Sequence, residues 1–464
     1  MTDLTVAYYA DDFTGSTDVL EAFATAGLRT VLFLEPPDED ALSDFEDVDV
    51  VGVAGRSRTM TPEEMDGQLP DVFSQLGALD PDLCYYKVCS TFDSSPEIGS
   101  IGRAIDIGRE VFDTDAVPVV VAAPSLEPRG RYVAFGNLFG TVDGTTYRLD
   151  RHPTMRQHPV TPMTEADLTE HLGAQTDATI GCIELTTVDG AFNRSIWTAY
   201  DRERRERDVV LFDGINHEHQ RTVGSVIWRT CSQRREQPMF AVGSVGLGYA
   251  LVGHWVKTGV IDHLSALDPP APVEQILVTA GSVSPVTDAQ IDWALHHGFE
   301  GIRVRTAALL EPATAADERD RVVAAATNVL EGGESPLVYT GRGPDDPAIE
   351  RTRQRATRLD IAESELGSRL GSELGKITRG IVDDGNVGRI CLAGGDTSGH
   401  VAPALDIVAL EYIGPVAPGS PLCDVIAEDP RVNGCEIVFK GGQVETTADE
   451  PNFFGVVRDG EDRY

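Results

Sequence analysis

Short runs of β-branched and aromatic residues recur along the first half of the chain, and segments with helical periodicity separate them. The run at 117–123 is apolar throughout, which is typical of a parallel strand covered on both faces. This alternation predicts an α/β fold with a doubly wound, mainly parallel sheet. Helices are expected at 14–27, 62–76 and 97–111. Strands are expected at 4–9, 30–34, 49–55, 83–88, 117–123, 179–185, 208–214 and 238–248.

The alternation begins again after a proline-rich stretch at 265–275, where a domain boundary is expected. The segment 128–165, rich in Arg, Gly, His and Pro, is expected to be irregular. We therefore expect two domains, 1–268 and 272–464, each built on a mainly parallel β-sheet flanked by helices. Strands of the second domain are expected at 275–281, 299–305, 336–343, 388–395 and 435–442, and helices at 285–297, 317–331 and 359–380.

The net charge of -37 restricts the partners of the chain. Such an excess of Asp and Glu disfavours binding to nucleic acid and to anionic membranes. The acidic residues are spread along the whole sequence, which indicates a surface adapted to the salt-rich cytosol of a halophilic microbe. Only four lysines remain, so each of them is expected to have a local role. The start of the chain lacks the pattern of a signal peptide, and a cytoplasmic location is expected.

The seven cysteines form no C-x-x-C pair and lie mostly in apolar segments. We expect them to be buried free thiols, without a metal or disulfide role.

Polar and charged residues follow the expected strands of the first domain. Asp11 and Asp12 come directly after the first strand, and Arg58 follows the strand at 49–55. The carboxyl ends of parallel strands meet at one edge of a sheet, where ligands bind. Arginine binds carboxylates, and Asp and Ser bind hydroxyls, so a small, hydroxylated, anionic ligand is expected rather than plain solvated turns. The full set of expected ligand-binding residues there is Thr14, Ser57, Arg58, Ser90, Thr91, Asp93 and Arg131.

Glycines and hydroxyls follow the expected strands of the second domain. Glycine lets the backbone approach a ligand closely, and N–H groups at the start of a helix bind phosphate. These strand ends therefore predict a nucleotide-phosphate site, and "GSVGLG" at 243–248 adds a further candidate contact, Ser244. The segment "GSELGKIT" at 371–378 is not a P-loop, because its spacing is one residue short. The expected nucleotide-binding residues are Ser244, Gly281, Ser282, Ser284, Thr340, Gly394, Gly395, Asp396, Thr397, Ser398, Lys440, Gly441 and Gly442.

Several of these stretches together resemble the four-carbon acid sugar kinase family over nearly the whole chain. The motifs that carry the resemblance are "ADDFTGSTD" (10–18), "SRT" (57–59), "GSVSPVTDAQI" (281–291), "GGDTSG" (394–399) and "KGG" (440–442). The resemblance implies a sugar-acid-binding N-terminal domain, an ATP-binding C-terminal domain and Mg²⁺ as the metal that accompanies ATP.

The branch of the family is indicated by "CSTFDS" (89–94), "GRYVAFGNLFG" (130–140) and "MRQHPVTPMTEADL" (155–168), which are similar to 3-oxo-tetronate kinases. The chain departs from that branch at "SPEIGSIGRA" (95–104), in the expected sugar site. A 3-oxo-tetronate kinase is therefore expected first, with a 3-oxo-isoapionate kinase as the nearest competitor. Threonate and erythronate are further alternatives as substrates.

Phosphoryl transfer needs an oriented hydroxyl, neutralised charge and exclusion of water. Asp11 or Asp12 is expected to accept the proton of the terminal hydroxyl of the acid, and Arg58 to hold its carboxylate. Lys87, the first lysine of the chain, is the third expected catalytic residue. A non-catalytic protein that binds a sugar acid and a nucleotide is the rival function, and a homodimer is one of the oligomeric states left open.

Overall fold

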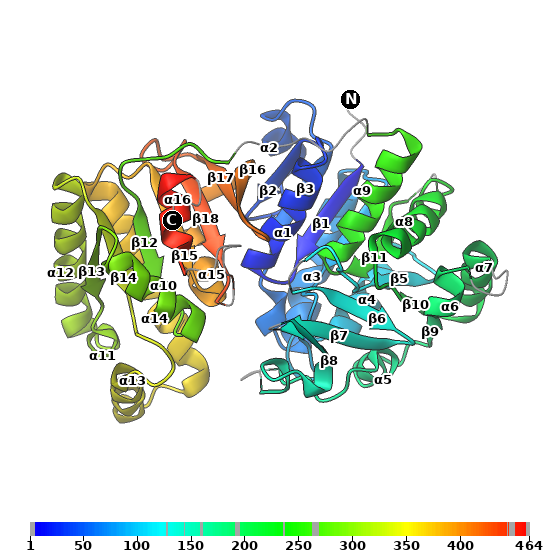
Figure 1. The fold of residues 1–464 in the computed structure, drawn as a ribbon, viewed down its shortest axis with the longest axis horizontal. Helices are drawn as coiled ribbons and strands as arrows, with labels where there is room; N and C mark the ends of the chain where they lie inside the picture. The colour runs from blue at the N-terminus through cyan, green and yellow to red at the C-terminus, as the bar shows by residue number, and fades with distance from the viewer. Residues whose placement is uncertain are drawn as a thin grey trace. The chain divides into compact units, whose positions relative to one another are not determined.

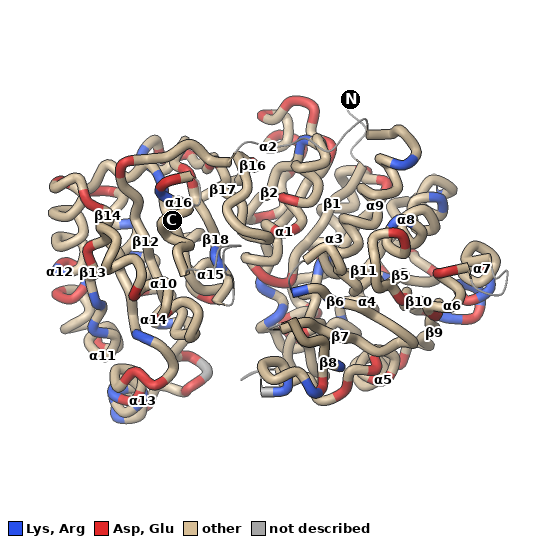
Figure 2. The backbone as a smooth tube through the Cα atoms, in the orientation of Figure 1, with Lys and Arg blue, Asp and Glu red and all other residues tan. Residues whose placement is uncertain are grey.

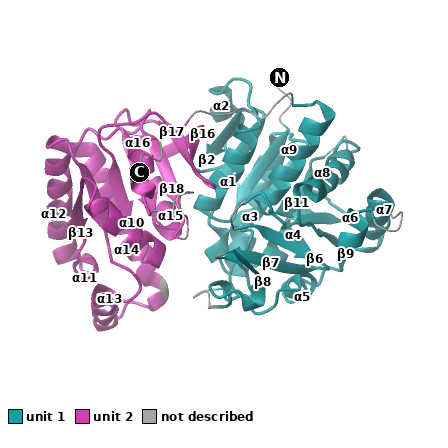
Figure 3. Cartoon of the chain, viewed as in Figure 1, with its two compact units in different colours: residues 1–266 teal, residues 267–464 magenta. Residues whose placement is uncertain are grey.

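The computed structural model describes residues 5–126, 129–142, 144–157, 161–190, 195–234, 237–261, 269–442, 444 and 451–460. The chain divides into two compact units, residues 1–266 and 267–464 (Figure 3). Each unit is an α/β structure in which helices cover a mainly parallel sheet (Figure 1).

The first unit has the strand order β2-β3-β1-β4-β11-β5-β10-β9, and its strand pairs are parallel. The central strands are buried along their whole length because helices cover both faces. The predicted strands of this sheet are present, although residue 4 lies outside the described residues. The strand predicted at 238–248 ends at Gly243, because a helix begins at Val245. The strands are β1 (Val6–Ala10), β2 (Thr30–Phe33), β3 (Val50–Ala54), β4 (Leu83–Lys87), β5 (Val117–Val120), β9 (Ile180–Ile183), β10 (Val209–Phe212) and β11 (Met239–Gly243).

Most helices of the first unit begin at capping side chains that the sequence supplies. Thr61 and Glu64 form a capping box at the start of α3, and Ser100 accepts a hydrogen bond from the Arg103 N–H at the start of α4. The helices are α1 (Phe13–Ala24), α2 (Glu39–Ser43), α3 (Pro62–Ala78), α4 (Ile101–Val111), α5 (Leu168–Gly173), α6 (Leu185–Val188), α7 (Ile196–Glu206), α8 (His217–Cys231) and α9 (Val245–Thr258).

The expectation that residues 128–165 are irregular is wrong. An antiparallel sheet forms there from β6 (Arg131–Ala134), β7 (Asn137–Val142) and β8 (Thr145–Arg148). Phe135 and Gly136, which join β6 to β7, both have positive φ. The Asp213 carboxylate, distant in sequence, accepts hydrogen bonds from both of their N–H groups. The sequence pattern misses this sheet because its strands are short and only half-buried.

The second unit has the strand order β13-β14-β12-β15-β18-β17-β16. Its first five strands are parallel and confirm the predicted ones, whereas β16 and β17 form a long antiparallel pair that was not predicted. The strands are β12 (Leu277–Ala280), β13 (Phe299–Arg303), β14 (Ser335–Tyr339), β15 (Arg389–Ala393), β16 (Ile407–Ala417), β17 (Ser420–Ala427) and β18 (Glu436–Lys440).

The predicted helices of the second unit are also present, and "GSELGKIT" lies inside one of them, α14. The helices are α10 (Pro285–Leu295), α11 (Thr306–Leu309), α12 (Pro312–Glu331), α13 (Pro347–Arg358), α14 (Glu363–Asp384), α15 (Gly395–Ala404) and α16 (Phe453–Asp459).

Acidic residues are distributed over both units (Figure 2). The seven cysteines are free thiols, as expected, and five of them are buried. In the part of the chain that the structure describes, every helix is too short or too polar to cross a lipid bilayer.

Candidate active site

The polar residues of the first unit come together where three neighbouring strands end. Ala10, the last residue of β1, pairs with Ala54 on one side and with Lys87 on the other. The Asp11 N–H donates to the Lys87 carbonyl at 2.9 Å, and the Arg58 N–H donates to the Asp11 carbonyl at 3.0 Å. Backbone hydrogen bonds therefore fix the Asp pair beside both basic residues.

Arg58 binds both adjacent carboxylates. Its Nε lies 3.1 Å from Asp11 Oδ2, and its Nη2 lies 2.7 Å from Asp11 Oδ1 and 2.8 Å from Asp12 Oδ1. Such a bidentate ion pair is strong and directional. The structure thus brings Arg58 to the predicted site, but its Nε and Nη2 bind carboxylates of the protein itself.

Asp12 is both a helix cap and a site residue. Its Oδ1 accepts a hydrogen bond from the Gly15 N–H at 3.0 Å, and its Oδ2 accepts one from the Thr14 hydroxyl at 2.8 Å. The side chain of Asp12 is 21% exposed, whereas that of Asp11 is only 2% exposed. Of the two carboxylates, Asp12 is therefore the one that a ligand can reach.

The two carboxyl groups also differ in pKa. Burial raises the pKa of Asp11 to about 6, although the positive charge of Arg58 opposes this. Burial acts in the same direction on Asp12, but the charges of Arg58 and Lys87 and the hydrogen bonds from Thr14 and Gly15 lower its pKa overall. Asp12 is therefore ionised throughout the physiological pH range.

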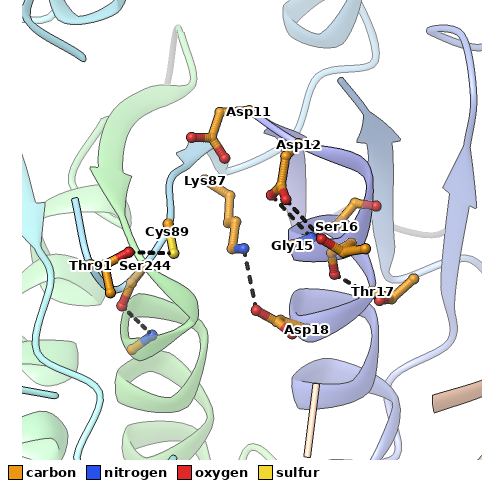
Figure 4. Close-up of polar contacts among 12 residues, drawn as sticks. Asp11, Asp12, Gly15, Ser16, Thr17, Asp18, Lys87, Cys89, Thr91 and Ser244 are labelled. Carbon is orange, nitrogen blue, oxygen red and sulfur yellow. Dashed lines mark hydrogen bonds and ion pairs between the residues drawn. The ribbon is translucent and has the colours of Figure 1, made fainter. Parts of the chain in front are cut away.

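Lys87 is 1% exposed, and its ammonium lies against helix α1 (Figure 4). Its Nζ is 3.4 Å from Asp18 Oδ2, and a Cβ added to Gly15 would lie only 2.1 Å from that Nζ. Burial acts to lower the pKa of Lys87, but Asp18, Asp12 and Asp11 raise it overall, so the amine stays charged. Asp18 was not predicted as a site residue, although it is the last residue of the motif "ADDFTGSTD" and follows Thr14 by one helical turn.

The loop after β4 carries three more of the predicted residues. Ser90 is half-buried, and the Thr91 hydroxyl lies 2.8 Å from both Asp93 Oδ2 and Cys89 Sγ. Phe92 between them has φ 58°, a conformation that is strained for a bulky side chain. The strained backbone places Thr91 and Asp93 in the buried part of the site.

Ser57 and Arg131 have different environments. The Ser57 hydroxyl is buried and shares a 2.9 Å hydrogen bond with the Tyr86 hydroxyl, so it supports the strand ends from within the protein. Arg131 exchanges backbone hydrogen bonds of 2.9 and 3.2 Å with Ala123, just beyond β5. Arg131 therefore stands at the same sheet edge as the Asp pair.

In the second unit, hydroxyls and a buried lysine join two strand ends. Ser284 caps α10, where it accepts a hydrogen bond from the Thr287 N–H at 3.1 Å, and it donates to the Gly442 carbonyl. Lys440 Nζ donates to the Thr287 hydroxyl at 3.2 Å and to the Gly441 carbonyl at 3.0 Å. Thr287 was not predicted. Its place three residues after Ser284 is a signal only for the capping hydrogen bond of its N–H, not for the contact of its hydroxyl with Lys440.

Glycines let the loops after β12 and β15 pack closely. A Cβ on Gly281 would lie 2.1 Å from Thr397 Oγ1, and a Cβ on Gly394 would lie 2.7 Å from the same atom. Gly394 also has φ 128°, which favours glycine. The starts of α10 and α15 are thereby brought together, and N–H groups at helix starts bind phosphate.

The remaining predicted residues of the second unit lie around these loops. Thr340 donates to the Gly281 carbonyl at 3.2 Å, and Ser398 donates to the Gly394 carbonyl at 2.9 Å. Asp396 is exposed in the first turn of α15, which begins at Gly395.

Ser244 is not among these residues, because it lies in the first unit. It is fully buried, donates to the Val121 carbonyl at 2.7 Å and accepts from the Gly246 N–H at 3.0 Å. Its hydroxyl is therefore engaged in capping α9.

Two family models match the chain, a sugar-binding N-terminal domain over residues 6–251 and a nucleotide-binding C-terminal domain over residues 277–446. A 3-oxo-isoapionate kinase from Paraburkholderia graminis is 44% identical over 457 residues, which cover 98% of this chain and 94% of that protein. The chain belongs to the four-carbon acid sugar kinase family. The resemblance seen in the sequence is confirmed, and this family member is a sugar-acid kinase.

Other relatives of this kinase are more distant. A 3-oxo-tetronate kinase from Pseudomonas savastanoi pv. phaseolicola is 28% identical over 418 residues, which cover 89% of each chain. A solved structure from Salmonella typhimurium LT2, described as a putative tRNA synthase, has a TM-score of 0.76 and 26% identity, and covers 99% of this chain and 100% of that one. A Haemophilus influenzae protein with a TM-score of 0.68 and 20% identity, covering 97% and 99% of the two chains, shows the same fold. The higher identity favours the 3-oxo-isoapionate alternative over the branch expected first.

Proposed function

We propose that this kinase transfers the γ-phosphoryl group of ATP to the terminal hydroxyl of 3-oxo-isoapionate, a branched sugar acid. The observation that carries this choice is the 44% identity to a 3-oxo-isoapionate kinase along 98% of the chain. 3-Oxo-tetronate is the second candidate substrate, since several kinases for that acid match about nine-tenths of the chain at 28–30% identity.

The different environments of Asp11 and Asp12 support different roles for the two carboxylates. Asp12 is ionised and partly exposed, so it is the carboxylate that accepts the proton of the attacking hydroxyl. Asp11, held by Arg58 on both oxygens, positions that arginine beside Asp12. The buried ammonium of Lys87 offsets negative charge that develops during transfer.

The second unit supplies the features that bind ATP phosphates. The starts of α10 and α15 present N–H groups beside the close-packed glycines, and such groups bind phosphate without a side-chain charge. Lys440 is fully buried and bonded to Thr287 and Gly441, so it holds this loop in shape.

Mg²⁺ fits this arrangement as a companion of the nucleotide. Among the described residues, no three His, Cys, Asp or Glu side chains are grouped closely enough to hold a metal ion. Kinases take most Mg²⁺ ligands from phosphates and water, with one or two carboxylates from the protein. Asp396, exposed at the start of α15, is such a carboxylate. A bound Mg²⁺ would neutralise phosphate charge.

The test is ADP release at high KCl over a panel of 3-oxo-isoapionate, 3-oxo-tetronate, threonate and erythronate. We expect the highest kcat/KM with 3-oxo-isoapionate, by about 10-fold or more, because added or missing groups in a fitted pocket change kcat/KM by that order. A preference for 3-oxo-tetronate would select the second candidate. Tight binding of an acid without ADP release would indicate a non-catalytic binding protein instead.

We also propose that the kinase is cytoplasmic and forms a homodimer. Sedimentation velocity at high salt tests the homodimer, since a monomeric chain would sediment as a 50.0 kDa species.

A further inference from the structure

Three buried polar atoms in the first unit, at or near the candidate site, have no hydrogen-bond partner among the described residues. They are Asp93 Oδ1, Arg131 Nε and His152 Nε2. Asp93 is 8% exposed and His152 is 3% exposed, so bulk solvent has little access to either side chain. Folded proteins pair nearly all buried polar groups, so these three atoms call for a partner that the described residues do not supply.

Arg131 lies close to the turn that carries His152. A Cβ on Gly140 would lie 3.2 Å from Arg131 Nη1 and 3.0 Å from the side chain of Leu149. His152 follows Leu149 by one turn and donates its N–H to the Leu149 carbonyl at 3.1 Å. Burial and the charge of Arg131 lower the pKa of His152. Burial also lowers the pKa of Arg131, and the negative charge of Asp93 opposes that effect.

The hydrogen bonds of His152 show which ring nitrogen carries the proton. Its Nδ1 accepts from the N–H groups of Thr154, at 3.3 Å, and Met155, at 3.4 Å. A neutral imidazole that accepts at Nδ1 carries its hydrogen on Nε2. The lowered pKa keeps the ring neutral, so His152 presents a buried N–H donor.

Arg131 has unpaired hydrogen-bond donors, and Asp93 has an unpaired acceptor. The Nη1 of Arg131 donates to the Arg129 carbonyl at 2.6 Å, while its Nε–Nη2 edge has no partner in the described part of the chain. Asp93 accepts from Thr91 through Oδ2 and has Oδ1 left as an acceptor. The cluster therefore offers a planar pair of arginine donors, one histidine donor and one acceptor.

We propose that Arg131 and His152 hold the carboxylate of the sugar acid, while Asp93 accepts a hydrogen bond from one of its hydroxyls. This inference rests on the proposed function, and it moves the carboxylate away from Arg58, whose Nε and Nη2 already bind Asp11 and Asp12. An Nε–Nη2 edge of arginine matches the two oxygens of a carboxylate.

The test uses His152→Asn and Arg131→Lys in the full-length protein. His152→Asn keeps an acceptor near the position of Nδ1 but loses the Nε2–H donor. Arg131→Lys keeps the positive charge but loses the planar Nε–Nη2 pair of donors. We expect each variant to raise the KM and the calorimetric Kd for the acid about 10- to 100-fold, as for loss of a hydrogen bond to a charged group, with the KM for ATP unchanged. The carboxamide analogue of the acid should bind wild type weakly, and Arg131→Gln should reduce the preference for acid over amide.

The matched control is His219→Asn. His219 is also buried, at 4% exposed, and also accepts at Nδ1, but its Nε2 has a partner, Asp189, at 3.3 Å. Unchanged acid affinity in both site variants, or an equal loss in His219→Asn, would overturn the inference. If thermal unfolding shows that His152→Asn does not fold, Arg131→Lys decides alone. Wild-type protein that phosphorylates no acid would instead refute the proposed function, while calorimetry still tests the carboxylate pair.

Discussion

Asp11 and Asp12 are adjacent in the chain, yet their surroundings give them different chemistry. Arg58 binds both oxygens of Asp11, which is nearly inaccessible, whereas Asp12 is partly exposed and caps α1. A general base must be able to reach the proton that it accepts, so access comes before pKa in choosing between the two carboxylates. Asp12 meets that condition, and we propose that Asp11 acts through the arginine.

The first prediction concerns Asp12→Asn, which keeps the size and the capping oxygen of the side chain but removes the base. Its kcat should fall about 10²–10⁴-fold, with KM values close to wild type, because only the proton acceptor is lost. Steady-state kinetics with the preferred acid measure this. Wild-type turnover in both Asp12→Asn and Asp11→Asn would exclude the pair from the reaction.

The second prediction concerns the pH dependence that Asp11 imposes. Because burial raises its pKa from 3.8 to about 6, kcat/KM should fall as the pH drops through about 6 and the ion pair with Arg58 weakens. The same shift stabilises the fold below pH 3.8, and this stabilisation is lost as the pH rises through about 6. Asp11→Asn should remove the acid limb of the pH–rate profile. An acid limb unchanged in that variant would assign it to another group.

Many candidate residues of the first unit could be predicted from the sequence, because they directly follow strands. Asp11, Asp12 and Arg58 follow strands that the apolar pattern identifies, and Lys87 is conspicuous in a chain with four lysines. His152 could not be found in this way. Its proposed role depends on a 3₁₀ turn and a small sheet that place it near Arg131, and no local sequence pattern encodes that arrangement.

At the scale of elements, apolar runs predicted the parallel strands because these strands are buried along their length. The sheet of β6, β7 and β8 was missed because half-buried strands carry polar residues. Its connection also depends on Asp213, which lies nearly 80 residues away in the sequence. The local sequence pattern thus predicts the parallel sheets, whereas the small sheet beside the candidate site depends on contacts between residues distant in sequence.

The third prediction concerns the loop between β15 and α15. Gly394→Ala places a Cβ 2.7 Å from Thr397 Oγ1 at a φ of 128°, so the start of α15 must shift. We expect the KM for ATP to rise by about 10-fold or more, since a displacement near 1 Å in a positioning element has effects of that order. The KM for the acid should change little.

Gly399→Ala is the matched control for this change, because its Cβ would meet no atom within 4 Å in the same helix. Equal KM values for ATP in Gly394→Ala and wild type would exclude the start of α15 from nucleotide binding.

At the scale of the whole molecule, a net charge of -37 makes stability depend on salt. The Debye length falls from about 10 Å at 0.1 M to about 3 Å at 1 M salt, which screens repulsion between acidic side chains. The fourth prediction is that Tm and activity rise together with KCl and that dialysis to low salt inactivates the enzyme. Sucrose at equal osmolality is the control. Full activity and an unchanged Tm at low salt would contradict adaptation to a salt-rich cytosol.

Transfer of a phosphoryl group from ATP to a sugar acid can be followed by ³¹P NMR of the completed reaction. With ATP and 3-oxo-isoapionate, we expect ADP and a new phosphate monoester on the terminal hydroxyl of the acid, in equal amounts. ADP together with inorganic phosphate and unmodified acid would contradict it.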